Sequence, residues 1–329
     1  MDEHQALTVP ATLHQSRLDA ALAALMPGIS RTAAGELIED GAVAVNSRVV
    51  FDQARRVYAD DLIEVTQKEP EPLTDEPQDL PFTELYRDEH LVVLDKPAGL
   101  TVHPARTQPD GTLMNALLFR YPASAALERA GIVHRLDRDT SGIMVVALSA
   151  PAQRVLKRAV SHHELVREYQ AVVEGCLTAG GSVNAPLGRD PHNRLRYAVV
   201  PEGLGREAVT HYRVAARFAH HTLLRLRLET GRTHQIRVHM AHLGYPLVGD
   251  PVYGTRRLRI PEGATAELTA CLRDFHRQAL HSTRLILKHP IDGRELDFTA
   301  PLPEDMQQLL AALRADEAAR EAREAANSS

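Results

Sequence analysis

An acidic, proline-rich stretch over residues 66–81 constrains the fold of this chain more than any other feature. Its sequence, TQKEPEPLTDEPQDLP, holds four prolines and five acidic residues. Because proline interrupts helices and sheets, and so many charges cannot be buried, we expect this stretch to be a linker. The chain should therefore fold as a small domain over residues 14–75, which overlaps the linker, and a large domain over residues 82–315, before a charged tail over residues 316–329.

The composition is typical of a soluble globular protein. The 329 residues suffice for two domains, and 44% hydrophobic and 25% charged residues are ordinary proportions. No apolar run is long enough for a transmembrane helix, and the N-terminal MDEHQALTVP lacks the pattern of a secretion signal. We therefore expect a cytoplasmic protein without membrane contact, a monomer by default, whose two cysteines stay reduced.

Charge is distributed unevenly along the chain. The net charge of −5 argues against a nucleic-acid partner, but contact with phosphate depends on local charge. Residues 66–90 carry eight acids against Lys68 and Arg87, whereas residues 186–259 carry thirteen arginines, five acids and no lysine. The planar fork of arginine suits phosphate and base edges, although a solvated, salt-bridged surface would show the same pattern.

The small domain shows two helices followed by a hairpin. Apolar residues at helical spacing over 17–25 predict the first helix, and Ser30 and Gly41 are suited to cap the ends of the second. Residues 42–50 predict two short strands around an Asn-Ser turn, and residues 60–65 predict a last strand. This pattern alone indicates no function.

The large domain mixes strands and helices without regular alternation. Amphipathic spacing predicts helices near residues 112–121 and 233–244, and several apolar or alternating runs predict strands. A polar loop at residues 134–140 lies between two apolar segments that both predict strands. The segment from Glu304 to about Ala326 predicts a charged helix. These elements indicate an α+β domain around a mixed sheet.

The polar loop concentrates groups that can carry chemistry. Its sequence, HRLDRDTSG over residues 134–142, brings two aspartates, two arginines and a histidine to the end of an apolar strand. Functional sites are commonly built on such loops over a rigid scaffold. A salt-bridged turn would have the same composition, so spacing alone leaves both interpretations open.

A second segment, GRTHQIRVH over residues 231–239, places arginines and histidines at the start of a helix. A zinc site built from His234, His239 and His242 would lack the HExxH pattern and any nearby cysteine pair, so we expect no metal. A helix N-terminus with arginine and threonine side chains is better suited to an anion.

Three blocks resemble the signature motifs of one enzyme family. GIVHRLDRDTSGIMVVAL, VREYQAVVEG and LETGRTHQIRVHMAHLGYPLVGDPVYG are similar to blocks of the RluA-type pseudouridine synthases. Residues 14–65 resemble the S4 RNA-binding module of a subgroup that acts on the large ribosomal subunit. The resemblance covers about residues 14–315 and implies a mixed, mainly antiparallel catalytic domain behind a small S4-like α/β domain. No nucleotide-binding or kinase motif competes with it.

The resemblance also implies roles for individual residues. Asp137 would be the catalytic carboxylate, Arg237 its countercharge, and Tyr169 would stack on the uracil. Arg135 would fill the gap left when the target base is extruded from the RNA stack. The plainer alternatives are a surface ion pair for Arg237, a core aromatic for Tyr169 and a phosphate contact for Arg135. Further expected RNA contacts are His134, Thr140, Arg232 and His234 in the large domain, and Arg31, Arg48, Arg55 and Arg56 in the small one.

The implied reaction breaks the N1–C1′ bond of uridine, turns the base and rejoins it through C5. It involves no redox change or energy input, so we expect no metal and no other cofactor. The implied partner is 23S ribosomal RNA, with its helix 69 stem-loop as substrate, in the large ribosomal subunit or its precursor. The sequence does not show which uridines are modified, whether free RNA is the substrate, or the order of the chemical steps.

Two other function classes remain open at this point. A non-catalytic RNA-binding or ribosome-assembly factor would need only the S4-like module and the arginine-rich block. The joint presence of Asp137, Tyr169 and Arg237 distinguishes an enzyme from such a binder. A glycoside or nucleoside hydrolase would normally require a second catalytic carboxylate, which the resemblance does not supply.

Overall fold

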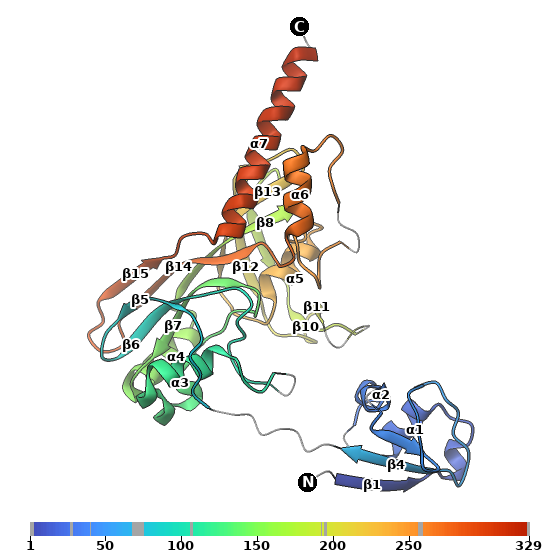
Figure 1. Ribbon diagram of the computed structural model, residues 1–329. Helices are drawn as coiled ribbons and strands as arrows, with labels where there is room; N and C mark the ends of the chain where they lie inside the picture. The colour runs from blue at the N-terminus through green and yellow to red at the C-terminus, as the bar shows by residue number, and fades with distance from the viewer. Residues whose placement is uncertain are drawn as a thin grey trace. The chain divides into compact units, whose positions relative to one another are not determined.

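The chain forms two compact units, Met1–Pro72 and Leu73–Ser329, in a computed structural model (Figure 1). The structure describes residues 3–26, 29–39, 41–67, 76–105, 108–191, 193, 196–255 and 259–327. Half of the predicted linker, residues 68–75, lies outside the described residues. Each unit is therefore considered by itself below.

Unit 1 packs two helices against a small sheet. Within its described residues the sheet has four strands, ordered β1-β4-β2-β3, and every neighbouring pair is antiparallel. Apolar side chains from the helices and strands share one core, which includes Leu18, Leu22, Ile38 and Ile63. The elements are β1 (Glu3–Thr8), a 3-10 turn (Ala11–Leu13), α1 (Leu18–Leu25), α2 (Arg31–Glu39), β2 (Val43–Val45), β3 (Arg48–Val49) and β4 (Leu62–Gln67).

Local sequence accounts for most of unit 1. The Ser30 hydroxyl accepts the N–H of Ala33 at 3.2 Å, and this capping contact begins α2 as predicted. Asn46 and Ser47 both have positive φ, which the tight turn between β2 and β3 requires. Strand β1 was not predicted, and it begins well before residue 14. Its weakly apolar sequence gives little signal, and its pairing with β4 places it in the sheet.

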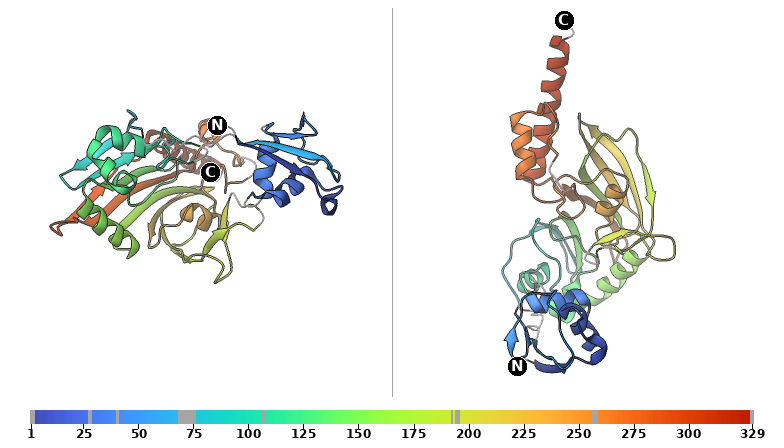
Figure 2. Two further views of the ribbon diagram at one scale, coloured as in Figure 1. Left: turned by 90° about the horizontal axis from the view of Figure 1, so that it is seen from below. Right: turned by 90° about the vertical axis from the view of Figure 1, so that its right-hand side faces the viewer.

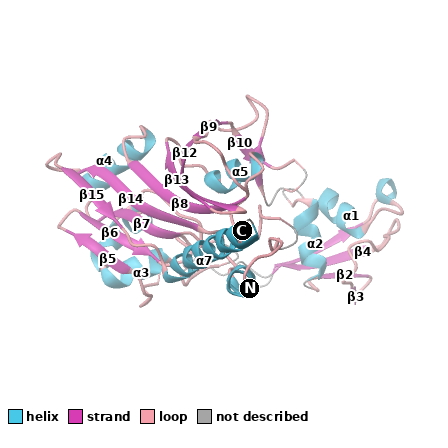
Figure 3. Cartoon of the chain, turned by 90° about the horizontal axis from the view of Figure 1, so that it is seen from above, coloured by secondary structure: helices cyan, strands magenta, loops and turns pink. Residues whose placement is uncertain are grey.

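Unit 2 is built on a long twisted sheet (Figure 3). In the described residues the sheet has nine strands, ordered β5-β6-β7-β14-β8-β13-β12-β9, with β15 paired to β14. Only the β7–β14 pair is parallel, so the sheet is mixed and mainly antiparallel, as predicted. The strands are β5 (Thr83–Arg87), β6 (Leu91–Lys96), β7 (Ser141–Ala147), β8 (Val166–Glu174), β9 (Gly181–Asn184), β12 (Val209–Arg217), β13 (His221–Leu228), β14 (Leu280–Lys288) and β15 (Glu295–Thr299); a separate hairpin pairs β10 (Leu187–Arg189) with β11 (Tyr197–Val199).

Helices cover both faces of this sheet (Figure 2). Alternation along β6 sends Val92 and Leu94 into the core that contains α3 and α5, and Leu91 and Val93 into the core that contains α4. A third core joins α6 and α7 to the β8 and β13 region. The helices are α3 (Leu113–Arg120), α4 (Ala150–Ser161), α5 (Gln235–His242), α6 (Ala266–Asp274) and α7 (Glu304–Asn327).

One prediction for unit 2 was wrong in detail. Residues 131–133 do not form a strand, because only the single bridge Ile132–Val146 joins them to β7. The charged helix predicted from Glu304 to about Ala326 is α7, which continues without a break through residue 316, where we placed the start of the charged tail. Asp316 is buried there and accepts the N–H of Thr265 at 2.6 Å. None of the helices in the described segments combines the length and apolar character needed to span a lipid bilayer.

Candidate active site

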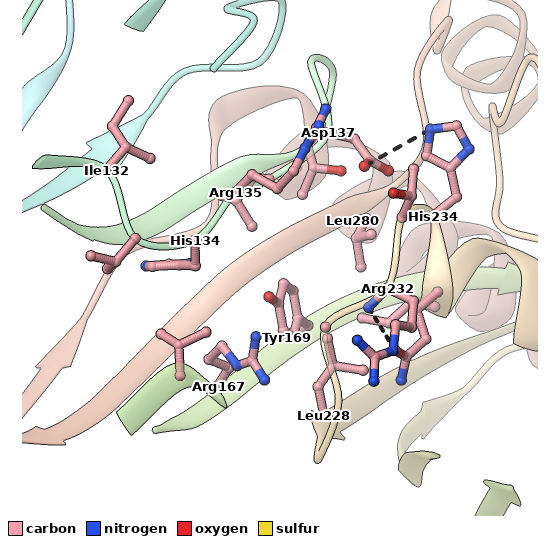
Figure 4. A pocket seen from close by; sticks show the side chains of 18 of the residues that line it. Ile132, His134, Arg135, Asp137, Arg167, Tyr169, Leu228, Arg232, His234 and Leu280 are labelled. Carbon is pink, nitrogen blue, oxygen red and sulfur yellow. Dashed lines mark hydrogen bonds and ion pairs between the residues drawn. The ribbon is translucent and has the colours of Figure 1, made fainter. Parts of the chain in front are cut away.

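A cavity of about 470 Å³ opens in unit 2 above the middle of the sheet (Figure 4). Its walls come from the 131–140 loop, from β8 and from the turn that leads into α5. These are the three blocks that stood out in the sequence, so the fold brings together segments about a hundred residues apart. The predicted residues that line the cavity are His134, Arg135, Asp137, Thr140, Tyr169, Arg232, His234 and Arg237.

The loop that carries Asp137 is anchored from below by a buried lysine. The Lys96 ammonium at the end of β6 donates three hydrogen bonds of 2.8 Å, to the carbonyl oxygens of Pro97, Leu100 and Arg138. The Arg138 oxygen also accepts the N–H of Gly99 at 3.0 Å. Burial lowers the pKa of Lys96 to about 7, although nearby aspartates oppose that shift. The amine thus fixes the backbone directly after Asp137.

An arginine from another segment holds the next peptide of the loop. Arg277 donates to the carbonyl oxygen of Asp139 at 3.2 Å, and its guanidinium also forms a two-point ion pair with Asp305 at the start of α7. Beside it, the Gln278 amide donates to the Thr140 hydroxyl at 3.0 Å. The loop is therefore connected to α7 through side chains that sequence analysis did not identify.

Asp137 meets a cation in the wall of the cavity. Its Oδ2 accepts a hydrogen bond of 3.1 Å from Nη1 of Arg237, which lies on α5. The remaining edge of that guanidinium is held by Asp250, through contacts of 2.7 Å from Nε and 2.9 Å from Nη2. The Asp137 side chain is 17% exposed, whereas those of Arg237 and Asp250 are 5% and 0% exposed. Asp137 thus presents a carboxylate to the cavity from a fixed ion-pair network.

Burial and ion pairing shift the pKa values of Arg237 and Asp250 in opposite directions. Burial alone would lower the pKa of Arg237, but its hydrogen bonds to Asp250 and the charge of Asp137 raise the pKa instead. Burial likewise favours a protonated Asp250, yet the Arg237 guanidinium and two backbone N–H groups hold its pKa below the usual range. Arg237 therefore stays positively charged beside Asp137 at any ordinary pH.

Tyr169 projects from β8 into the same cavity and is only 6% exposed. Its cross-strand neighbours are Leu226 on β13 and Ser282 on β14. Burial raises the pKa of the phenol, so the ring carries a neutral hydroxyl. A flat, rigid ring at the side of a polar cavity is suited to contact a planar ligand.

His234 marks the entry into α5. It adopts a left-handed conformation (φ 56°), and its Nδ1 lies 2.9 Å from the hydroxyl of Tyr253. Its Nε2 lies 3.9 Å from Oδ1 of Asp137, as the dashed line in Figure 4 marks. Burial lowers the pKa of His234 although Asp137 opposes the change. Nearby, Arg232 donates from Nε to the carbonyl oxygen of Glu207 at 2.9 Å, which orients its guanidinium.

The other loop residues fall into two groups. His134 accepts the N–H of Val145 at 3.0 Å, and burial lowers its pKa to about 3, so it is neutral. Thr140 is 2% exposed and engaged with Gln278. Arg135 differs from both, because its side chain is exposed at the cavity rim and makes no hydrogen bond or ion pair to any described residue.

The histidines considered for zinc do not converge. His239 is buried, with Nδ1 2.8 Å from the hydroxyl of Thr210 and Nε2 3.0 Å from the carbonyl oxygen of Ala185. Within the described segments no group of three or more His, Cys, Asp or Glu side chains is arranged to hold a metal ion.

Comparison with known proteins identifies the family. A model described as RNA pseudouridylate synthase matches residues 90–242, and an S4 domain model matches residues 16–63. The chain is 50% identical over 300 residues to ribosomal large subunit pseudouridine synthase D of Escherichia coli K12, with 91% of each chain covered. The chain belongs to the RNA pseudouridine synthases. The family, the S4 module and the enzyme class that the sequence predicted are thereby confirmed.

Two further relatives agree with the family, and two solved structures agree with the fold. The enzymes of the same name from Vibrio cholerae and Xanthomonas campestris are 50% and 49% identical, covering 91% and 94% of this chain and 92% of each of theirs. Human RNA pseudouridylate synthase domain containing 4 and domain containing 1 both superpose with a TM-score of 0.53 at 24% identity. They cover 70% and 74% of this chain, and 93% and 98% of their own, and they support the fold alone.

The predicted RNA contacts of the S4 module lie in unit 1 of the synthase. Arg31 is paired with Asp19 at 3.1 Å, and Arg56 donates to the carbonyl oxygen of Gln15 at 2.7 Å. Arg48 is exposed on β3 and Arg55 is half-buried. Arg31 is thus partly neutralised, while the other three arginines form no ion pair with a described residue.

Sequence reasoning missed several residues that build the synthase cavity. Asp250 appeared only as part of a family block, and Lys96 was not singled out. Asp250 pairs with a residue thirteen positions away, across the end of α5, so no helical or strand periodicity connects the two. The one sequence signal for Asp250 is the segment GDPVYG, in which an aspartate begins a tight turn. In the structure the Asp250 carboxylate accepts the backbone N–H groups of Val252 and Tyr253 in this turn.

Proposed function

We propose that this synthase isomerises uridines in large-subunit ribosomal RNA, the helix 69 stem-loop included, with Asp137 as the catalytic carboxylate. The substrate class is supported by relatives named for the large ribosomal subunit and by the S4 domain. The role of Asp137 is supported by one observation: its carboxylate lines the cavity and is held there by the Arg237–Asp250 pair.

A carboxylate in this setting is suited to attack or deprotonate the ribose. The N1–C1′ bond must break and the base must stay in the cavity until C5 bonds to C1′. The Arg237 guanidinium lies 3.1 Å from the Asp137 carboxylate and places a positive charge beside the group that would attack the sugar or remove its proton. Tyr169 would contact the flat face of the uracil while it turns.

The target uridine has to leave the RNA stack to enter a cavity of this kind. Arg135 is the proposed wedge, because its exposed guanidinium stands at the cavity rim without a described partner. A planar cation can stack between the bases that the extruded uridine leaves behind. Arg232 and His234, on the opposite wall, would contact the RNA that flanks the site.

The test is a comparison of the wild type with Asp137→Asn on unmodified large-subunit RNA. Pseudouridines are mapped after single-turnover incubation. The wild type should form product within helix 69, and Asp137→Asn should form none, because an amide cannot act as a nucleophile or base.

Asp139→Asn is the matched control. The Asp139 carboxylate pairs with Arg138 at 3.0 Å, so this variant removes an equal charge two residues away and should keep activity. Equal product from Asp137→Asn and the wild type would remove Asp137 from the mechanism. No product from the wild type would overturn the substrate proposal.

The same assay gives a prediction about metals. Product formation should be undiminished after treatment with EDTA, because the proposed steps use only side chains of this chain. Any magnesium needed to fold the RNA is supplied by pre-folding, with cobalt hexammine as a control cation. Loss of product that zinc restores would contradict the prediction.

A further inference from the structure

Arg167 is a buried cation that the proposed mechanism does not use. It projects from β8 two residues before Tyr169, and it is only 6% exposed. Figure 4 shows the two side chains next to each other along the cavity wall. Because residues two apart on a strand point to the same face, Arg167 and Tyr169 present their side chains to the same part of the cavity.

The guanidinium of Arg167 is poorly satisfied within the protein. Its Nε has no hydrogen-bond partner, and Nη2 makes one long contact of 3.4 Å to the carbonyl oxygen of Glu229. Among the described residues it forms no ion pair, unlike Arg237, which has two carboxylates. Its cross-strand neighbours are Leu228 and Leu285, and neither has a polar side chain to offer it.

Such an arrangement is costly unless a ligand completes it. A buried charge without a counterion is among the most unfavourable features of a folded protein. The turn beside it leaves room for the cation at Gly231, where a Cβ atom would lie 2.6 Å from Nη1. The position is therefore built around the guanidinium, and the missing partner must come from the cavity.

We propose that Arg167 donates to a carbonyl oxygen of the target uracil and stabilises the negative charge on the base when it leaves the sugar. This inference rests on the proposed function. In the attacking route, Asp137 bonds to C1′ as the C1′–N1 bond breaks, and the electron pair of that bond passes to N1 and is delocalised onto O2 and O4 of the uracil. After the base turns, C5 bonds to C1′ while the Asp137–C1′ bond breaks and the carboxylate is released. The proton on C5 then passes to solvent, and N1 takes up a proton.

Depth in the cavity favours the base over a phosphate as the ligand. A phosphate of the target nucleotide stays attached to the RNA chain and must lie near the open rim, where Arg135 is exposed. Arg167 is buried beside Tyr169, the ring proposed to contact the uracil face. A donor at that depth reaches the edge of a base lying on the ring.

The first test uses Arg167→Met, which keeps an unbranched chain in an apolar setting, and Arg167→Gln as a second variant. Under single-turnover conditions both should form pseudouridine about a hundredfold more slowly than the wild type, the usual cost of losing one donor to developing charge. RNA affinity and its salt dependence should not change. Arg154→Met, at an exposed arginine of α4 outside the cavity, should react at the wild-type rate.

A second test identifies the atom contacted. RNA with 2-thiouridine or 4-thiouridine at the target position replaces one carbonyl oxygen by sulfur, a weaker acceptor. The wild type should lose about tenfold in rate on one of the two substrates, whereas Arg167→Met should react equally with both thio substrates and with uridine.

Several outcomes would overturn the inference. Wild-type rates in a folded Arg167→Met and Arg167→Gln would show that the cation is not used. A variant that lowers the salt slope of RNA binding by about one unit would show a phosphate ligand instead. If sulfur substitution slowed the wild type and the variant by the same factor, Arg167 would not contact a carbonyl oxygen of the base. Each of these requires an active wild type, so failure of the proposed function itself is distinguishable.

Discussion

At the scale of single residues, the cavity depends on buried charges that face backbone carbonyls or one another. Arg237 has two carboxylate partners, Lys96 has three carbonyl oxygens, and Arg277 combines both kinds of contact. Lys96 and Arg277 hold the backbone of the Asp137 loop, and Arg237 holds its carboxylate. The charge state of Lys96 is linked to folding stability, because burial shifts its pKa, and this makes its contribution measurable.

Lys96 gives a prediction for the pH dependence of stability. Its pKa is lowered to about 7 in the folded state, from 10.5 in the unfolded chain. Between these values the unfolded chain binds a proton that the folded chain lacks, so this group makes stability rise with pH. Relative to Lys96→Met, the wild type should gain up to about 1.4 kcal/mol per pH unit across that window.

Urea unfolding of both proteins from about pH 6.5 to about pH 9.5 measures this difference. Below pH 7 the variant should be less stable by about 2–4 kcal/mol, because the Pro97 and Leu100 oxygens lose their donor. The Arg138 oxygen keeps the Gly99 N–H. Free energies that run parallel across the whole range would show that the buried amine keeps an ordinary pKa.

The sequence could identify Asp137, Arg237 and Tyr169 as a set, but not the residues that hold them. Asp137, Tyr169 and Arg237 each lie in one of the three segments that resemble family motifs. Asp250 acts through an ion pair across a turn, and Arg277 through a backbone oxygen 138 residues earlier, and neither contact has a periodicity. The burial of Arg167 depends on strands from three parts of the chain, which the pattern VREYQAVVEG alone does not specify.

At the scale of elements, the parallel β7–β14 contact sets the position of the Asp137 loop. Gly142 lies two residues after Thr140 at the start of β7, with a φ of 116°. A Cβ atom there would lie 2.2 Å from the carbonyl oxygen of Ser282 on β14. The two strands can approach this closely only because residue 142 has no side chain.

Gly142→Ala should therefore destabilise the protein strongly. Backbone atoms of β14 cannot move aside cheaply, so we expect a loss of more than about 3 kcal/mol and little soluble enzyme. Gly244→Ala is the matched control, since Gly244 has a φ of 85° but nothing within 4 Å of the added atom. It should lose only about 1–2 kcal/mol from the left-handed backbone. Equal melting temperatures for the two variants would contradict the steric argument.

Strands and helices with strong periodicity were predicted from the sequence, and the segments without it were not. The apolar run before the Asp137 loop predicted a strand, yet residues 131–133 follow Arg129 and Ala130, both with positive φ. That backbone turns the segment away from regular pairing. Strand β1 was missed because its local sequence pattern is weak. Its pairing with β4, a contact that is distant in sequence, places it in the sheet.

At the scale of the whole molecule, the two units have separate hydrophobic cores. Among the described residues, the core of unit 1 draws on residues between 7 and 65, and the cores of unit 2 draw on residues from 80 onward. A unit with its own core can in principle fold alone. The chain should thus divide its tasks between a catalytic unit and an RNA-binding unit.

Removal of residues 1–75 should leave a folded enzyme. The fragment 76–329 retains the cavity and its supporting charges, so it should unfold cooperatively and form pseudouridine at the wild-type rate when RNA is saturating. Its affinity for the RNA should be lower, since the S4 domain is lost. Calorimetry of the fragment and the full chain checks this, and a fragment without a cooperative transition would show that unit 2 depends on unit 1.

The contribution of unit 1 to RNA binding can be tested without cutting the chain. Arg55→Glu with Arg56→Glu reverses two charges that form no ion pair with a described residue, and Arg56 is otherwise held only by the Gln15 carbonyl oxygen. If both contact phosphates, RNA affinity should fall, and the salt slope of binding should decrease by about two units. The rate at saturating RNA should be unchanged, because the residues that line the cavity all lie in unit 2.

The matched control is Lys288→Glu with Arg314→Glu, which makes the same change in net charge at exposed positions of unit 2. A similar loss of affinity in this control would reflect the overall charge of the protein. Unchanged affinity of the Arg55 and Arg56 variant in a filter-binding assay would mean that this face of unit 1 does not contact the RNA.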